Sequence, residues 1–471
     1  MDSLMIGVSG VRGVIGKSLT PELITRFAMA FGTYLRGGTV IVGRDTRVSG
    51  AMVKHSVFAG LISTGCQIID LGIATTPSCS LSIVELKADG GIVISGSHNP
   101  VEWNALKFFR NDGICLNVEQ GKELLDIYYQ GSFRHAPWHS LKEDKQDYNA
   151  GQRHMKKVMA NTDVDLIHHR APKVVLDSCN GAGSIITPKF LRQMGCEVTE
   201  VHCEPNGLFP HNPEPIFVNL GDLCAKVKEV GADIGFAQDA DADRLAIVDE
   251  NGQFLGEEYT LALAVLATLE HGKGPVVINL STSRMSEDVA RRFGCEVVHT
   301  PVGEANVAER MKAVHAVIGG EGNGGVINPE VHYGRDSLSG MAIVLQLLAQ
   351  RGKKLSEIAA ELPRYYMRKV KIDCTRDVAL ELVRRVQHEY AGQKMNQEDG
   401  IRIDWPDAWI HVRPSGTEPA VRIIGEATTP EKIDELCDRF SDMARAMLKN
   451  NGIGAESEDA DDEPGPQPTQ G

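Results

Sequence analysis

The stretch VIVGRDTRVSGAMVKHSVFAGLISTGCQIIDL, residues 40–71, holds two apolar runs on either side of an amphipathic segment. Val40–Gly43 reads as a strand, residues 49–64 as a helix and Gln67–Leu71 as a second strand. Gly65 stands where the helix ends, at a position that favours a left-handed residue. The stretch therefore predicts a strand, a helix and a strand in series.

The same order occurs twice more along the chain. The second and third units consist of Lys173–Asp177, a helix after Gly183 and Glu197–Val201, then Pro275–Asn279, a helix after Ser283 and Glu296–His299. Strands that alternate with helices favour mostly parallel sheets with helices on both faces. We therefore expect three similar α/β domains with mixed, mostly parallel sheets.

A segment of another kind follows Pro363. Its expected strands are Lys369–Cys374, Gly400–Asp404, Ala408–Arg413 and Val421–Glu426, and its expected helices are Val378–Tyr390 and Pro430–Leu448. Antiparallel strands with two helices predict a C-terminal α+β domain. The expected boundaries give domains at 1–150, 151–255, 256–366 and 367–450, followed by a tail at 451–471.

The composition limits the partners. A chain of 471 residues is too long for one hydrophobic core, and a net charge of −14 argues against nucleic acid or an anionic membrane as a partner. The last twenty residues, from Gly452, carry six acids and no base, so the rest of the chain carries −8. This acidic tail should be disordered.

The ten cysteines are scattered, with no CxxC pair, which fits reduced thiols in a cytoplasm. The first ten residues do not resemble a signal peptide, and no apolar run approaches the ~20 residues that span a bilayer. We expect a cytoplasmic protein that acts as a monomer or a homodimer.

The sequence SGSHNP, residues 95–100, follows the apolar strand Gly91–Ile94. Glycine and the Asn-Pro step predict a tight turn that holds Ser97 at the C-terminal end of a strand, where open α/β sheets bind ligands. A plain serine turn is the alternative; a serine-hydrolase elbow is not, because it requires GxSxG. Lys107, on the next expected strand, is placed to reach back as a cationic acid/base.

The sequence DADADR, residues 239–244, is the sharpest local signal. On an extended segment Asp239, Asp241 and Asp243 would share one face, and carboxylates this close stay ionised only around a cation. All-oxygen ligands select Mg²⁺ or Ca²⁺. An EF-hand is disfavoured because Arg244 stands where its loop needs glycine. A solvated acidic turn is the alternative.

Two further loops have polar groups suited to a sugar phosphate. GEGNGG, residues 320–325, offers Glu321 and Asn323 to adjacent sugar hydroxyls, although alone it reads as a glycine turn. RPSGTEP, residues 413–419, joins two strands and combines hydroxyls, backbone amides and guanidiniums suited to a dianionic phosphate; a hairpin with an exposed arginine is the alternative. Its expected phosphate ligands are Arg413, Ser415, Gly416, Thr417 and, shortly after, Arg422.

Arginines near the N-terminus have two expected roles. In SGVRG, residues 9–13, the glycine-flanked Arg12 is placed to meet a phosphate. In GRDTR, residues 43–47, a strand-to-helix junction with a buried ion pair is expected, and Ser49 is expected to cap the helix that follows.

The four loops, in this order, resemble those of the α-D-phosphohexomutases from Ile6 to about Leu448, and most closely those of the archaeal and Bacteroides type of phosphoglucosamine mutase. The resemblance implies four domains around a central cleft. It also implies that Ser97 carries a phosphate, that Asp239, Asp241 and Asp243 bind Mg²⁺ with it, and that Arg244 flanks the metal. It places Ser97, Lys107, Arg12 and His98 at the catalytic centre, and Arg244 with the sugar and phosphate loops at the substrate. Gly325 stands where the family commonly has histidine, Ala105 where it has glycine, and DADADR replaces DGDADR.

The implied reaction moves a phosphoryl group between two hydroxyls of one hexose phosphate through a 1,6-bisphosphate, and a sugar 1,6-bisphosphate or a kinase must first prime Ser97. Glucosamine 6-phosphate is the expected substrate, with mannose or glucose phosphate as the alternative within the family. A phosphosugar phosphatase and a non-catalytic sugar-phosphate sensor are the rivals from other classes. A second phosphate site argues against the phosphatase, and the retained Ser97 and aspartates argue against the sensor.

Overall fold

The computed structural model describes residues 4–7, 10–416 and 419–450. The acidic tail and Thr417 of the expected phosphate loop lie outside these ranges. Within them, no helix combines the length and the apolar character needed to cross a membrane. All ten cysteines are free thiols.

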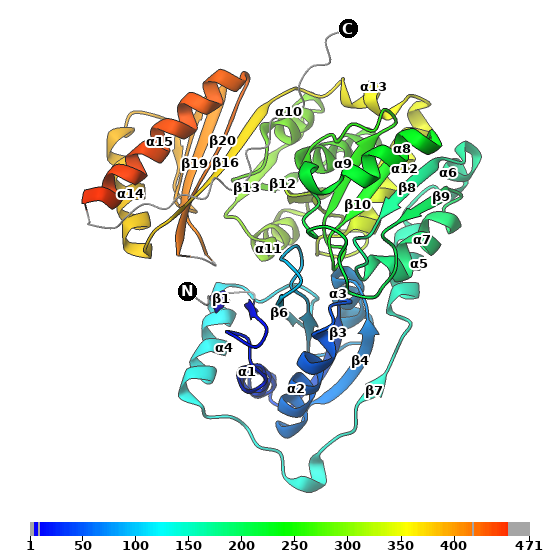
Figure 1. Ribbon diagram of the computed structural model, residues 1–471, viewed down its shortest axis with the longest axis vertical. Coiled ribbons are helices and arrows are strands. Elements are labelled where there is room, and N and C mark those ends of the chain that lie inside the picture. Colours follow the sequence, from blue (N-terminus) through cyan, green and yellow to red (C-terminus); the bar gives the residue numbers. More distant parts are fainter. Residues whose placement is uncertain (1–3, 8–9, 417–418, 451–471) are drawn as a thin grey trace.

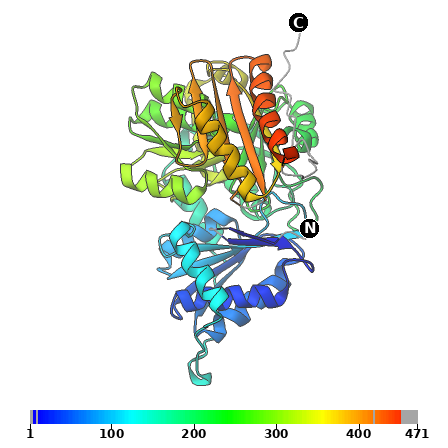
Figure 2. The same ribbon diagram turned by 90° about the vertical axis from the view of Figure 1, so that its left-hand side faces the viewer.

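Four sheets with their helices form the molecule (Figure 1). The first sheet, in blue and cyan, lies below the second and third, and the orange and red fourth sheet lies beside the third. A quarter turn shows the first sheet and its helices below the other three units (Figure 2).

The first sheet has seven strands in the order β1-β2-β6-β5-β3-β4-β7. Side chains alternate between its two faces: Val40 and Val42 pack with the cluster that contains α1 and α2, and Ile41 packs with the one that contains α3. The strands are β1 Met5–Gly7, β2 Gly10–Val14, β3 Thr39–Arg44, β4 Gln67–Ile73, β5 Gly90–Ile94, β6 Trp103–Arg110 and β7 Lys145–Gln146; the helices are α1 Pro21–Tyr34, α2 Gly50–Ser63, α3 Thr76–Glu85, α4 Val118–Gln130 and the short η1 Trp138–Ser140.

The second sheet has the order β11-β10-β8-β9 and the third β13-β12-β14-β15. The second unit contains β8 Lys173–Asp177, β9 Glu197–Val201, β10 Ile234–Gln238, β11 Leu245–Asp249, α5 Ala150–Ala160, α6 Val164–Arg170, α7 Gly183–Gln193, η2 Phe217–Asn219 and α8 Gly221–Val230. The third contains α9 Glu257–His271, β12 Val276–Asn279, α10 Arg284–Arg292, β13 Val297–Thr300, α11 Glu304–Val314, β14 Ile318–Glu321, β15 Gly325–Ile327, α12 Ser337–Arg351 and α13 Leu355–Ala359. One apolar cluster, which includes Phe236 and Leu261, fills the space between these two sheets.

The three α/β units repeat one strand pattern. In β4-β3-β5-β6, β9-β8-β10-β11 and β13-β12-β14-β15 the first three strands are parallel and the fourth is antiparallel to its neighbour. The prediction of three similar, mixed and mostly parallel units is confirmed. In each unit the connection from the third to the fourth strand is a short turn at the carboxyl end of the parallel strands, so the three turns occupy equivalent places.

The fourth sheet is antiparallel throughout, in the order β16-β20-β19-β18-β17, and two helices cover it, as expected for the α+β domain. Its elements are β16 Tyr366–Asp373, α14 Arg376–Glu389, β17 Met395–Asn396, β18 Ile401–Trp405, β19 Ala408–Pro414, β20 Ala420–Ala427 and α15 Pro430–Asn450. The expected phosphate loop joins β19 to β20.

The junction after β3 differs in one respect from the prediction. Ser49 stands at the N-cap position of α2, but its side chain makes no capping hydrogen bond. Its backbone is helical, and its hydroxyl accepts a hydrogen bond from Asn104 Nδ2 at 3.0 Å. The cap prediction was therefore wrong because a long-range partner engages the hydroxyl. The expected ion pair between Arg47 and Asp45 is present at 3.0 Å, and both side chains are fully buried.

Candidate active site

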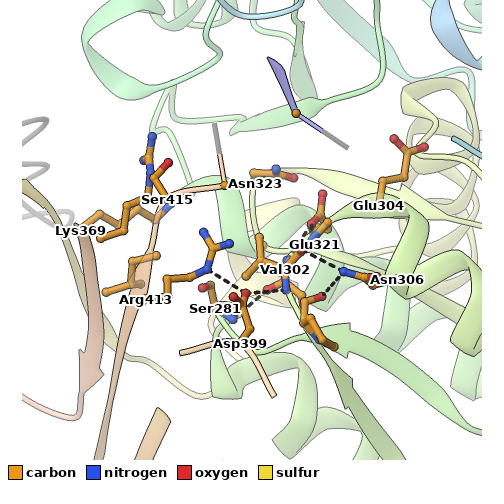
Figure 3. Close-up of a pocket in the computed structure, with 18 of the residues that line it drawn as sticks. Ser281, Val302, Glu304, Asn306, Glu321, Asn323, Lys369, Asp399, Arg413 and Ser415 are labelled. Atoms are coloured by element: carbon orange, nitrogen blue, oxygen red, sulfur yellow. Dashed lines mark hydrogen bonds and ion pairs between the residues drawn. The ribbon is translucent and has the colours of Figure 1, made fainter. Parts of the chain in front are cut away.

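The functional turns of all four units meet at one open cavity of about 1400 Å³. Figure 3 shows Ser415, Arg413 and Lys369 of the fourth unit on one side and Asn323 and Glu321 of the third on the other. The expected site residues that line the cavity are Arg12, Ser97, His98, Lys107, Arg244, Glu321, Asn323, Arg413, Ser415, Gly416 and Arg422.

Ser97 lies in the turn between β5 and β6 with a left-handed backbone, φ 50°, which costs a non-glycine residue of the order of 1–3 kcal/mol. A hydrogen-bond chain holds the turn: Ser97 N donates to Ser95 Oγ at 2.9 Å, and Ser95 Oγ donates to Asp45 Oδ2 at 2.7 Å. Arg47 donates to the carbonyls of Ser97 and Asn99 at 2.8 and 2.6 Å. A Cβ on Gly96 would lie 2.8 Å from the Arg47 guanidinium carbon, so the glycine admits this arginine.

The three aspartates converge in the turn between β10 and β11, and one oxygen from each lies within 4.8 Å of the others. All three are fully buried. The prediction had assumed an extended segment, but the segment is a turn. Ala242 has φ 58°, and Asp239 Oδ1 accepts hydrogen bonds from the backbone of Asp243 and Arg244. A tight turn, rather than alternation along a strand, brings the carboxylates together.

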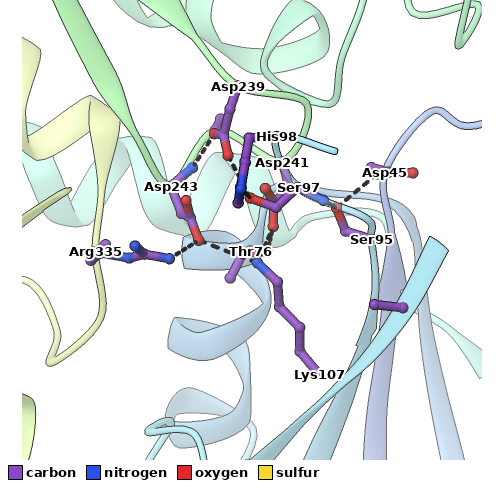
Figure 4. Close-up of polar contacts among 12 residues, drawn as sticks. Asp45, Thr76, Ser95, Ser97, His98, Lys107, Asp239, Asp241, Asp243 and Arg335 are labelled. Carbon is purple, nitrogen blue, oxygen red and sulfur yellow. Dashed lines mark hydrogen bonds and ion pairs between the residues drawn. The ribbon is translucent and has the colours of Figure 1, made fainter. Parts of the chain in front are cut away.

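Ser97 and the aspartates belong to one network (Figure 4). Ser97 Oγ donates to Asp239 Oδ2 at 2.7 Å. Lys107 Nζ, on β6, lies 2.6 Å from Asp241 Oδ2 and 3.2 Å from Asp243 Oδ2. The serine of the first unit is thus held directly against the carboxylates of the second.

A second cation joins the second unit to the third. Arg335, in the loop before α12, lies 2.7 Å from Asp243 and 3.0 Å from Glu321. Burial alone would favour the neutral form of each group. However, the carboxylates of Asp243, Glu304 and Glu321 hold the pKa of Arg335 far above its ordinary value. In the same way, Asp241 and Asp243 raise the pKa of Lys107. Both side chains are therefore cations inside the site.

The same charges shift the pKa values of two of the aspartates in opposite directions. Burial would raise the pKa of Asp243, but Arg335 and Lys107 outweigh it and hold that pKa below the usual range. Burial, with the charges of Asp243 and Asp241, raises the pKa of Asp239 well above its ordinary value. Asp239 is also the carboxylate that faces Ser97.

His98, Arg12 and Arg244 lie at the mouth of the Ser97 turn. His98 Nδ1 lies 3.5 Å from Ser97 Oγ, and burial together with Arg244 and Arg12 lowers the pKa of His98 well below its ordinary value. His98 is therefore a neutral imidazole. Arg12 Nη1 donates to Asn99 Oδ1 at 2.5 Å, and Arg244 Nη1 lies 3.1 Å from Glu214 Oε1.

In the expected sugar loop, Glu321 is 4% exposed and its carboxylate accepts from Asn279, the amide of Gly303 and Arg335 at 2.9–3.0 Å. Asn323 Oδ1 is buried and has no hydrogen-bond partner. Of the two residues expected to bind a sugar, Asn323 has an unsatisfied but buried acceptor, and Glu321 is already bound by the protein.

The fourth unit carries a row of cations. Arg413 on β19 pairs in register with Arg422 on β20, which pairs with Lys371 on β16, so the three residues are cross-strand neighbours. All three line the cavity, and Ser415 and Gly416 follow Arg413 there. Arg413 Nε also lies 2.8 Å from Asp399 Oδ2, which keeps the guanidinium oriented.

Several residues of the network were not anticipated from the sequence: Arg335, Thr76, Lys371 and, as a support of the turn, Arg47. Thr76, at the start of α3, donates to Asp241 Oδ2. Arg335 stands between a glycine and Asp336, which caps a helix. A glycine next to an arginine was the signal that pointed to Arg12, and the same signal was present at Arg335. Thr76 and Lys371 stand in ordinary helix and strand segments, so the sequence offered no signal for them.

Comparisons with known families agree with this geometry. Four family models match the chain in order: phosphoglucomutase/phosphomannomutase α/β/α domain I over residues 3–135, domain II over 152–252, domain III over 256–366 and the C-terminal domain over 369–443. The chain belongs to the α-D-phosphohexomutase family. It is a phosphohexomutase, an enzyme of the isomerase class.

Relatives of this phosphohexomutase carry two names. A phosphoglucomutase/phosphomannomutase of Thermococcus kodakarensis is 41% identical over 454 residues, 94% of this chain and 99% of its own length. A probable phosphoglucosamine mutase of Methanopyrus kandleri is 39% identical over 447 residues, 94% and 98% of the two chains.

Solved structures share the fold. A phosphoglucomutase/phosphomannomutase family protein of Burkholderia thailandensis has a TM-score of 0.82 at 26% identity and covers 96% of this chain and 98% of its own. An N-acetylphosphoglucosamine mutase of Aspergillus fumigatus, solved in complex with GlcNAc-6P and magnesium, has a TM-score of 0.57 at 16% identity, covering 94% and 96% of the two chains.

Proposed function

We propose that this phosphohexomutase interconverts glucosamine 6-phosphate and glucosamine 1-phosphate, with Ser97 as the phosphoryl carrier and a 1,6-bisphosphate as the intermediate. The observation that carries the proposal is the position of Ser97 Oγ, in a strained turn at the cavity wall and 2.7 Å from Asp239. We infer that the enzyme works in the cytoplasm, as a monomer or a homodimer, and that a sugar 1,6-bisphosphate or a kinase primes Ser97.

The aspartate turn fits a magnesium ion. Asp241 Oδ1 and Asp243 Oδ1 are buried without a hydrogen-bond partner, and the third carboxylate, Asp239, already contacts Ser97. An all-oxygen, anionic set of this kind suits Mg²⁺. When bound, the ion would neutralise charge on the phosphoryl group carried by Ser97.

The residues of the chain supply the other parts of the reaction. In the forward half-reaction the bond from phosphorus to Ser97 Oγ breaks, a bond to the sugar hydroxyl forms, and the hydroxyl proton must leave. His98 Nδ1 lies 3.5 Å from Ser97 Oγ, and a dianionic phosphoryl group on Ser97 would raise the pKa that burial, Arg244 and Arg12 lower, so we propose His98 as the residue that accepts this proton. Arg12 and Lys107 surround the transferring group with positive charge, as phosphoryl transfer requires.

The cation row of the fourth unit supports a mutase rather than a phosphatase. Arg413, Arg422 and Lys371 line the same cavity as Ser97 but lie on a different sheet. A hydrolase needs only one phosphate site, whereas a bisphosphate that turns end over end needs a second. We propose that this row holds the phosphate that is not reacting.

Glu258 supports an amino sugar as the substrate. It lines the cavity next to the sugar loop, where a Cβ on Gly322 would lie 2.0 Å from its Oε1. Glu258 Oε2 accepts a hydrogen bond from Ser283 N at 2.9 Å, and Lys369 is a nearby cation that lowers the pKa of Glu258. Burial raises the pKa of Glu258 to about 8. A buried acid in this position is a suitable partner for the 2-ammonium group of glucosamine, because the positive charge would favour its ionised form; glucose and mannose do not carry this group.

A substrate panel tests the proposal. The purified enzyme is primed with glucose 1,6-bisphosphate, and kcat/KM is compared for glucosamine, glucose and mannose 6-phosphates, with free phosphate measured alongside. Glucosamine 6-phosphate should lead, with side activity on the others because one sugar substituent discriminates by only a few kcal/mol. A tenfold or greater lead for mannose or glucose phosphate would establish the alternative named for the Thermococcus relative. Release of phosphate in place of isomerised sugar would establish a phosphatase.

A further inference from the structure

A second group of metal-ligating side chains lies in the second α/β unit, on the carboxyl edge of its sheet. Asp177 is the last residue of β8, and His202 follows β9, the parallel neighbour of β8. His211 comes from the loop between β9 and η2. One ligand atom from each of the three lies within 4.8 Å of the others.

The three side chains share one oxygen. His202 Nδ1 lies 3.0 Å and His211 Nε2 3.1 Å from Asp177 Oδ2. Ligands at about 2.0–2.1 Å from a tetrahedral zinc ion are separated from each other by about 3.3 Å. The other oxygen, Asp177 Oδ1, is occupied by the backbone amide of Cys179 at 2.8 Å, so Oδ2 alone faces the histidines.

Each histidine is oriented by an oxygen at its other ring nitrogen. His211 Nδ1 lies 2.8 Å from the carbonyl oxygen of Asn212, and His202 Nε2 lies 3.3 Å from Asp222 Oδ2. Histidines bound to metals show this arrangement, in which the outer N–H donates to a carbonyl or carboxylate and leaves the inner nitrogen for the ion.

His211 has an oxygen at each ring nitrogen: Nδ1 faces the carbonyl oxygen of Asn212, and Nε2 faces Asp177 Oδ2. A neutral imidazole has one N–H, so it can donate to only one of these two oxygens. A divalent metal satisfies the same carboxylate and leaves each imidazole with one N–H, directed at its oxygen.

We propose that Asp177, His202 and His211 bind a divalent transition metal, of which zinc fits the ligands best. Two imidazoles and one carboxylate are a frequent zinc set, and they differ from the all-oxygen aspartate turn that suits magnesium. Asp177 is 1% exposed, while the side chains of His211 and His202 are 14% and 21% exposed. Water therefore reaches the cluster and completes the coordination.

The proposed metal fastens a loop that reaches the catalytic turns. From this loop Glu214 forms the ion pair with Arg244 of the aspartate turn. Phe209 places its ring 4.9 Å from the guanidinium of Arg47, which supports the Ser97 turn. A metal at His202 and His211 holds the loop to the sheet on both sides of Phe209 and on the N-terminal side of Glu214.

The test uses cobalt as a spectroscopic substitute for zinc. Protein freed of metal by chelation is titrated with Co²⁺ in the presence of excess Mg²⁺, and the visible ligand-field bands are recorded. One equivalent should bind with tetrahedral bands that Zn²⁺ displaces. His202→Gln and His211→Gln should each weaken binding about tenfold or more. His154→Gln, in a separate buried histidine cluster, and Asp241→Asn should leave the bands unchanged.

X-ray absorption of the wild-type protein with one equivalent of Zn²⁺ gives an answer that does not depend on how the variants fold. The expected shell contains two imidazoles and oxygen. The proposal is overturned if wild-type protein binds no Co²⁺, if both histidine variants keep the bands, if Asp241→Asn removes them, or if the zinc shell contains no imidazole.

Discussion

The most informative perturbation outside the phosphoryl carrier is Arg335→Met. This arginine neutralises Asp243 at 2.7 Å and Glu321 at 3.0 Å, and its side chain is 11% exposed. Methionine fills much of the same volume without the charge. Removing one partner of a buried ion pair costs about 3–5 kcal/mol, and the lower end applies here because Lys107 remains 3.2 Å from Asp243.

The second and third units share one apolar cluster and should unfold together. For a unit of about 150–250 residues each kcal/mol corresponds to about 2–4 °C in Tm, so Arg335→Met should lower Tm by at least about 6 °C in chelator. Mg²⁺ should restore more of this loss in the variant than it adds to the wild type, because the ion takes over the missing positive charge next to Asp243.

Arg351→Met is the matched control. Arg351 also contacts two carboxylates, but these are Glu270 and Glu361 rather than residues of the aspartate turn. Its side chain is 27% exposed, compared with 11% for Arg335. Surface pairs contribute about 0–1 kcal/mol, so its Tm should change little and should respond to Mg²⁺ as the wild type does. Thermal unfolding followed by circular dichroism, with and without Mg²⁺, compares the three proteins. Equal losses for both variants, or an equal response to Mg²⁺, would refute the role given to Arg335.

Three further substitutions test other parts of the site. Asp241→Asn should lower kcat roughly 100-fold and raise KM less, since the metal acts on developing charge. Chelator should abolish wild-type activity and Mg²⁺ should restore it, whereas restoration by zinc alone would contradict an oxygen-ligated magnesium site. Arg413→Ala should raise KM for the sugar monophosphate about tenfold or more, with some loss of kcat, because a charge-assisted hydrogen bond to the non-reacting phosphate is lost; an unchanged KM would remove Arg413 from that site. Glu258→Gln should lower kcat/KM for glucosamine 6-phosphate about tenfold relative to glucose 6-phosphate, and an unaltered ratio would show that Glu258 does not contact the amine.

Local patterns predicted the parts of the fold that depend on local physics. Apolar runs followed by amphipathic segments located β3, α2 and β4 and their equivalents, because buried parallel strands are continuously apolar. The loops that carry Ser97 and the aspartates were found for a similar reason: glycine, Asn-Pro and repeated aspartates are unusual at the end of a strand.

The contacts that complete the site depend on the tertiary structure. Arg335 reaches Asp243 and Thr76 reaches Asp241 across more than ninety residues of sequence, so no local pattern encodes these pairs. The turn at Ala242 and the partner of the Ser49 hydroxyl were missed because each depends on packing that a one-dimensional pattern does not contain.

Ser97 is the proposed carrier of the phosphoryl group. Intact-mass analysis after incubation with glucose 1,6-bisphosphate should show one phosphate on the wild-type protein and none on Ser97→Ala, which should also lose mutase activity. Ser184→Ala is the matched control, since this α7 hydroxyl is buried without a hydrogen-bond partner and its loss should leave the phosphate and the activity in place. A Ser97→Ala protein that still takes up one phosphate, or that keeps more than a small fraction of mutase activity, would contradict the account.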